Sequence, residues 1–87
     1  MSKRVDQQSV NADQTFILFH TEACHLCEQA QALLDSLSVA YTREDICDSD
    51  TFVERYGIRI PVLLRQQDQL ELDWPFDIAQ LKEFTGA

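Results

Sequence analysis

An apolar run that leads directly into a helical repeat of leucines constrains the fold of this chain most. Residues 15–20 are rich in strand formers and include four consecutive large apolar side chains, which is typical of a central strand covered on both faces. From Cys24 to Leu37 the apolar residues recur at helical spacing and form a single core-facing stripe. The stripe comprises Leu26, Ala30, Leu33, Leu34 and Leu37. A buried strand followed by an amphipathic helix predicts an α/β fold.

Two further elements follow this first strand and helix. Residues 41–46 alternate weakly and carry three charges, which favours an edge strand over a central one. Residues 48–50 offer helix-capping side chains, and the apolar face behind them predicts a short second helix. We expect Gly57 to end this helix in the left-handed conformation that glycine tolerates best.

The remaining segment indicates a hairpin and a last helix. Residues 62–64 form a short apolar run, and residues 69–73 alternate with a period of two after a polar turn. Pro75 suits the first position of the last helix, and Gly86 suits its end. The predicted order is therefore strand, helix, strand, helix, hairpin, helix.

Length, charge and glycine content limit the possible functions. The 87 residues fit one domain, which we place at residues 15–87 after a flexible tail at residues 1–14.

A net charge of −8 disfavours nucleic acid and anionic membranes as partners. The two glycines lie too far apart for a phosphate-binding loop. The apolar run before residue 20 is too short for a signal peptide or a membrane span, so we expect a cytoplasmic protein.

The most informative motif is the cysteine pair Cys24-His25-Leu26-Cys27. Two cysteines three apart in the first turn of a helix can close a small disulfide ring, and the unpaired amides of that turn favour a thiolate on the first. On the helical wheel Cys27 lies nearer the apolar stripe than Cys24. The pattern therefore predicts Cys24 as the nucleophile and Cys27 as the thiol that resolves a mixed disulfide.

Two other interpretations of the cysteines remain open at this point. Both could be inert core residues, because unpaired cysteine is often buried. Alternatively, His20, Cys24, His25 and Cys27 are four possible zinc ligands within eight residues. Structural zinc sites usually draw a second ligand pair from another turn, and the wheel directs His25 away from the sulfurs, so we assign no metal site.

The chain resembles the glutaredoxin branch of the thioredoxin superfamily, and in particular the small bacterial glutaredoxin-like proteins with a Cys-x-Leu-Cys motif. The matching pieces are the strand at residues 16–19, the cysteine motif at residues 24–27, the segment at residues 57–63, the hairpin and the last helix. The resemblance covers residues 15–85. It implies a thioredoxin-like fold with a four-stranded mixed sheet in the order 2-1-3-4 and three flanking helices.

The resemblance also implies how a substrate would be held. The residue that matches Pro61 is a cis proline beside the cysteine pair, and the backbone of Ile60 would pair with an extended substrate segment. Glutathione-using members carry a lysine at the position of Thr21 and a glycine-containing turn where this chain has residues 73–77. Asp77 keeps the acidic residue of that turn. Glutathione is therefore left unassigned as a substrate.

Three further side chains are candidates for substrate contact. His25 and Leu26 lie between the cysteines, where His25 either tunes the thiolate or is simply exposed. Arg59 could bind a substrate carboxylate through two hydrogen bonds or could balance local acids.

Cys47 has no helical partner, and we expect a spare thiol that could bridge to another molecule if exposed.

Two classes of function follow from these observations. The first is a monomeric thiol-disulfide oxidoreductase that reduces disulfides of proteins or small thiols and needs no bound cofactor. The second is a binding module on the same fold that engages an extended peptide or a partner protein without turnover. The retained Cys27 favours the first, because a binding module has no use for a resolving thiol.

Overall fold

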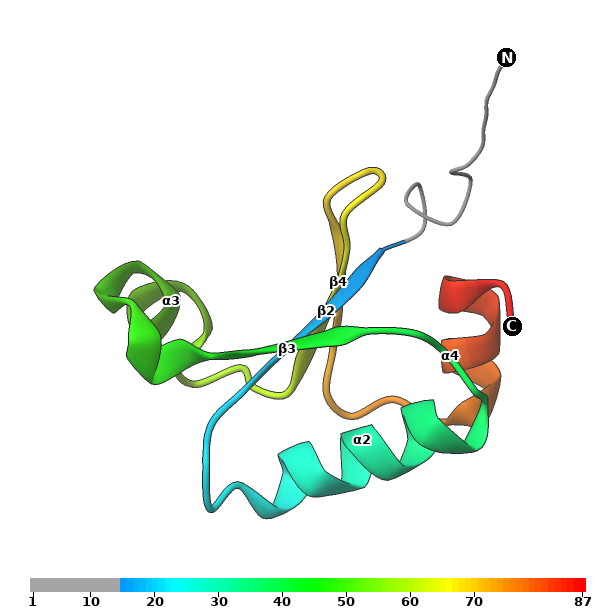
Figure 1. Cartoon of the computed structure of the whole chain (residues 1–87), viewed down its shortest axis with the longest axis horizontal. Coiled ribbons are helices and arrows are strands. Elements are labelled where there is room, and N and C mark those ends of the chain that lie inside the picture. The colour runs from blue at the N-terminus through cyan, green and yellow to red at the C-terminus, as the bar shows by residue number, and fades with distance from the viewer. Residues whose placement is uncertain (1–14) are drawn as a thin grey trace.

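The computed structural model describes residues 15–87, and the tail expected at residues 1–14 lies outside the described residues (Figure 1). The chain forms strand β2, helix α2, strand β3, the 3₁₀ turn η2, helix α3, the hairpin β4–β5 and helix α4. Their bounds are Phe16–His20 for β2, His25–Ser36 for α2, Thr42–Asp45 for β3, Ile46–Asp48 for η2, Asp50–Tyr56 for α3, Val62–Arg65 for β4, Leu70–Asp73 for β5 and Ile78–Thr85 for α4. None of the helices in this part of the chain combines the length and hydropathy that a membrane-spanning helix needs.

The four strands form one mixed sheet in the order β3-β2-β4-β5. β2 pairs in parallel with β3, whereas β4 pairs antiparallel with both β2 and β5. In order of appearance along the chain, this is the 2-1-3-4 arrangement, so the predicted fold class is confirmed. β3 is an edge strand, as its charged sequence predicts.

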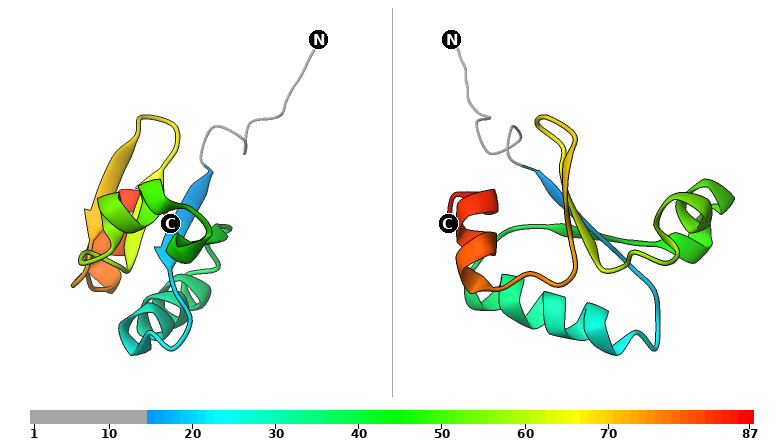
Figure 2. Two further views of the ribbon diagram at one scale, coloured as in Figure 1. Left: turned by 90° about the vertical axis from the view of Figure 1, so that its left-hand side faces the viewer. Right: turned by 180° about the vertical axis from the view of Figure 1, so that it is seen from behind.

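Helices α2 and α4 lie on one side of the sheet and α3 on the other (Figure 2), and an apolar core lies on each face. On one face, Leu18 of β2 and Leu63 of β4 are fully buried under α2 and α4. On the other face, Phe19 stacks on Tyr56 of α3 with ring centroids 4.0 Å apart. The central strands are therefore apolar on both faces, which explains the continuous run at the start of the sequence.

Gly57 ends α3 as predicted, but its predicted left-handed conformation and the predicted start of α4 at Pro75 are wrong. Gly57 has φ −50° in the right-handed region, and the chain turns through hydrogen bonds from the amides of Arg59 and Ile60 to the carbonyl of Tyr56. Glycine fits there for another reason, since a Cβ atom would lie 2.5 Å from the carbonyl oxygen of Val53. Pro75 precedes α4, whose N-cap is Asp77. Gly86 does end α4 with φ 77°.

Candidate functional site

One end of the sheet gathers the residues that the sequence singles out. β2 ends at His20 opposite Asp45, the last residue of the parallel strand β3. β4 begins at Val62 opposite Phe19, so Pro61 lies at this same end. Three segments therefore lie at the same end of the sheet. They are the loop that leads to Cys24, the turn that carries Cys47, and the residue Pro61.

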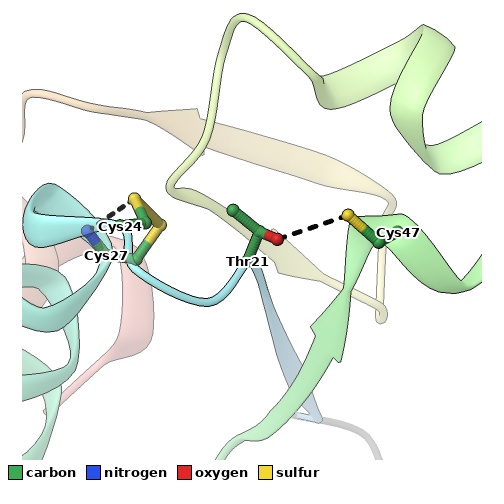
Figure 3. Close-up of a disulfide and its surroundings, with 4 residues drawn as sticks. All are labelled: Thr21, Cys24, Cys27 and Cys47. Carbon is green, nitrogen blue, oxygen red and sulfur yellow. Dashed lines mark hydrogen bonds between the residues drawn. A yellow bond between two sulfur atoms is a disulfide. The ribbon is translucent and has the colours of Figure 1, made fainter.

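Cys24 and Cys27 are joined in a disulfide at the start of α2 (Figure 3). Their Cα atoms lie 5.2 Å apart, within the range that a disulfide requires. Cys24 is the N-cap of α2, and its Sγ atom accepts a hydrogen bond from the Cys27 amide at 3.2 Å. The helix thus directs one of its unpaired amides at the Cys24 sulfur, which would favour negative charge there once the disulfide is reduced.

The two sulfurs differ in their access to solvent. Cys27 is 1% exposed and lies in line with the buried Ala30 and Leu34, whereas Cys24 is only half-buried. His25 is exposed, as the helical wheel predicts. The prediction that Leu26 faces the core is wrong, because the packed core reaches only to Ala30 and Leu26 is 43% exposed. Leu26 therefore lies on the surface between the cysteines, where a substrate could contact it.

Cys47 is an exposed thiol on the neighbouring turn. Its Sγ lies 3.4 Å from the hydroxyl of Thr21, and the two groups share a hydrogen bond (Figure 3). The backbone amide of Cys47 donates to Asp45, and this hydrogen bond holds the pKa of the Asp45 carboxyl below its usual value. η2 is thus fastened to the end of β3, beside the loop that carries Cys24.

The guanidinium of Arg59 is held by two carboxylates of β5. It donates to Asp73 at 2.7 and 3.1 Å and to Glu71 at 2.6 Å. The hydroxyl of Tyr56 donates to the second oxygen of Glu71 at 2.8 Å. Partial burial raises the pKa of Glu71, but the hydrogen bonds from Arg59 and Tyr56 outweigh it and leave that pKa below its usual value. A substrate carboxylate at Arg59 would have to compete with both acids.

The remaining predicted substrate contacts are at residues 60, 61 and 77. The Ile60–Pro61 peptide bond is cis, and Pro61 is fully buried. The amide of Ile60 donates to Tyr56, so only the Ile60 carbonyl can serve the expected pairing with a substrate. Asp77 accepts a hydrogen bond from the Gln80 amide at 2.8 Å, and the Gln80 side chain accepts one from the Asp77 amide. The Asp77 carboxylate therefore caps α4.

The sequence model of the Glutaredoxin-like domain (DUF836) family matches residues 15–85. The chain belongs to this family. Among solved structures, this glutaredoxin-like domain is similar to the crystal structure of target protein XcR50 from X. campestris, with 36% identity over 79% of this chain and 92% of that chain and a TM-score of 0.73. The solution structure of XcR50 gives a TM-score of 0.71 over 79% of this chain and 88% of that chain.

A more distant neighbour supports the fold alone. Protein Ne2328 from Nitrosomonas europaea is 23% identical over 83% of this chain and 91% of that chain, with a TM-score of 0.71. No curated protein matches the chain. The glutaredoxin-like fold is therefore established by both sequence and structure.

Sequence reasoning missed a cavity on the β3 side of the disulfide. It has a volume of about 390 Å³ and is lined by both cysteines, the loop at residues 20–23, Glu28 and Gln31 of α2, and Arg43 of β3. Gln31 lies one helical turn after Cys27, which is a readable signal. Arg43 reaches the cavity only because β3 pairs in parallel with β2 in the observed register, and sequence spacing does not reveal that register.

The described part of this glutaredoxin-like domain contains no set of side chains that could bind zinc. Across residues 15–87, no three His, Cys, Asp or Glu side chains come together as metal ligands. His25 is exposed on the first turn of α2, while the two sulfurs are bonded to each other. The site is organised around the disulfide.

Proposed function

We propose that this protein is a thiol-disulfide oxidoreductase that acts through Cys24 and Cys27. The observation that supports it best is the asymmetry of the pair: Cys24 is accessible and receives an amide hydrogen bond, whereas Cys27 is 1% exposed. A nucleophile must reach the substrate, and a resolving thiol must reach only the nucleophile. Membership of the glutaredoxin-like family is consistent with thiol redox chemistry.

The reaction follows from these positions. In the reduced protein, the Cys24 thiolate attacks one sulfur of a substrate disulfide, and the other sulfur leaves as a thiolate that takes up a proton. The thiolate of Cys27 then attacks the Cys24 sulfur of the mixed disulfide. This step closes the Cys24–Cys27 disulfide and releases the second substrate thiolate. Two electrons pass from the protein to the substrate, and an external thiol must supply them again.

Glutathione is a poor substrate in this proposal. Thr21 occupies the position of the family's lysine, and its hydroxyl is engaged with Cys47. Asp77 caps α4, and Arg59 is held by Glu71 and Asp73. We also place the protein in the cytoplasm as a monomer, where a thiol pool could return it to the dithiol state.

Two cysteine variants test the role of each sulfur. After reduction and challenge with a disulfide-containing peptide, Cys27→Ser should accumulate a mixed disulfide that mass spectrometry detects as one added peptide. Cys24→Ser should form no such adduct and should lose disulfide reduction, because Cys27 is buried. Cys47→Ser is the matched control and should behave like the wild type. An active Cys24→Ser protein, or an adduct on Cys47, would contradict the proposal.

A redox titration separates the enzyme from a binding module on the same fold. The oxidoreductase needs a Cys24–Cys27 couple that the cytoplasmic thiol pool can reduce, with a potential in the range of about −180 to −270 mV covered by thioredoxin-fold reductases and isomerases. A pair that stays oxidised under excess dithiothreitol would favour the binding module. Trapping the thiols with a mass tag at each potential gives the measurement.

A further inference from the structure

The cavity beside the disulfide is distinct from the segment that the family resemblance assigns to substrate. Ile60 and Pro61 directly precede β4 and do not line the cavity, which lies between the first turns of α2 and the edge strand β3. Both cysteines line it, so a substrate half bonded to Cys24 could extend into it. A volume of about 390 Å³ accommodates a small molecule of amino-acid size.

Arg43 brings an available cation to this cavity. Its Nη1 atom donates to the side-chain oxygen of Gln31 at 3.2 Å, which fixes the guanidinium against α2. Within residues 15–87, Arg43 makes no ion pair, in contrast to Arg59 and Arg65. An arginine whose guanidinium is held in place and still has unused N–H donors is well suited to bind a carboxylate.

The cavity also contains two acids. Glu22 and Glu28 are exposed on its lining, and neither forms an ion pair with any residue of the described part of the chain. A purely anionic substrate would meet Arg43 but would be repelled by these carboxylates. A substrate with both a carboxylate and an ammonium group can satisfy the two kinds of charge together.

We infer that this cavity selects small zwitterionic disulfides of the amino-acid type, such as cystine. The α-carboxylate of the half bound to Cys24 would accept hydrogen bonds from Arg43, and the α-ammonium would face Glu22 and Glu28. The inference rests on the proposed oxidoreductase function and names its substrate class. Arg43 is then a specificity residue, because it binds the substrate and takes no part in the exchange of sulfurs.

Three small disulfides with different charges test the inference. Cystine carries both groups, cystamine carries only ammonium groups, and 3,3′-dithiodipropionate carries only carboxylates. The reduced protein is mixed with each disulfide, and the second-order rate of Cys24–Cys27 oxidation is followed by quenching and mass spectrometry. The wild type should react fastest with cystine after correction for the intrinsic reactivity of each disulfide towards dithiothreitol.

The matched variants are Arg43→Gln and Arg55→Gln, which change the net charge equally. Arg55 lies on α3, forms no ion pair among residues 15–87 and does not line the cavity; its guanidinium lies over the Tyr56 ring at 5.7 Å, so its variant controls for overall charge at a site outside the cavity. Arg43→Gln should lower the rate ratio of cystine to cystamine by about tenfold, the loss of one charge-assisted interaction. Arg55→Gln should leave the ratio unchanged, and Glu22→Gln with Glu28→Gln should lower the ratio of cystine to dithiodipropionate.

The outcomes separate this inference from the proposed function. If no disulfide oxidises the protein, the oxidoreductase function fails and the substrate class fails with it. If all three disulfides react and Arg43→Gln slows them equally, Arg43 acts on the thiolate, and the inference is overturned while the function stands. A wild type that prefers cystamine or dithiodipropionate would overturn the zwitterion class in the same way.

Discussion

The two edges of the sheet each place an arginine near the disulfide end, in opposite electrostatic surroundings. At the β5 edge, Arg59 is closed into a network with Glu71, Asp73 and Tyr56. At the β3 edge, the one hydrogen-bond partner of the Arg43 side chain within residues 15–87 is Gln31, and Arg43 borders a cavity. The same residue type therefore serves the fold at one edge and remains available to a ligand at the other. In an acidic protein, an arginine such as Arg43, which has no ion-pair partner within residues 15–87, points more directly to a ligand site than Arg59 does.

Breaking the β5 network should have the largest effect on stability. Arg59→Met leaves the partly exposed carboxylates of Glu71 and Asp73 side by side without their cation, and we expect a loss of about 1 kcal/mol in the free energy of unfolding. Arg43→Gln should change that free energy by less than about 0.5 kcal/mol, because it loses one exposed hydrogen bond. Urea unfolding at pH 7 measures both. Equal losses in the two variants would remove the distinction between the edges.

The pH dependence of stability should come from the β5 edge as well. The pKa of Glu71 is lower in the folded protein than its unfolded value of about 4.3. Its contribution to stability is therefore fully present above that value and is lost as the pH falls through the folded pKa. The stability difference between the wild type and Glu71→Gln should shrink between about pH 5 and pH 3. Urea titrations across this range, with Glu28→Gln as the control, provide the check.

Salt should have the smallest effect, and mainly at the β3 edge. The screening length falls from about 10 Å at 0.1 M salt to about 3 Å at 1 M. We expect the preference for cystine over 3,3′-dithiodipropionate to fall roughly threefold across this range, because salt screens the repulsion of the dianion by this acidic protein and by the exposed acids of the cavity. The stability difference caused by Arg59→Met should change less, since its contacts are direct and partly buried. Rates and urea midpoints measured at both salt concentrations test this contrast.

The sequence predicted what depends on periodicity and failed where two local signals compete. The order of elements along the chain and the start of the helix at Cys24 follow from apolar patterns that the core enforces, whereas the strand order was implied by the family resemblance. For α4, proline at residue 75 and the Asp77–Gln80 capping box both mark a helix start, and the capping box prevails because it satisfies two amides at once. Both signals are visible in the sequence, but the sequence does not show which of them sets the first residue of α4.

The sequence predicted the part of the site formed by residues close together in the chain, but not the contacts between residues far apart in it. Cys24 and Cys27 lie three residues apart, so helix geometry alone places their sulfurs together. Arg43 and Gln31 meet only through the register of β3 and the side on which α2 packs. Such contacts depend on tertiary packing, and a single sequence holds no record of them.

The burial of Cys27 has a kinetic consequence for the proposed reaction. With one sulfur of the disulfide 1% exposed, both the electron donor and the electron acceptor must approach through Cys24. The two cannot be bound at that atom together, so no ternary complex forms and the half-reactions alternate. Steady-state rates would then give parallel lines in double-reciprocal plots, the signature of a ping-pong enzyme. Each partner would also inhibit the other by occupying the same sulfur.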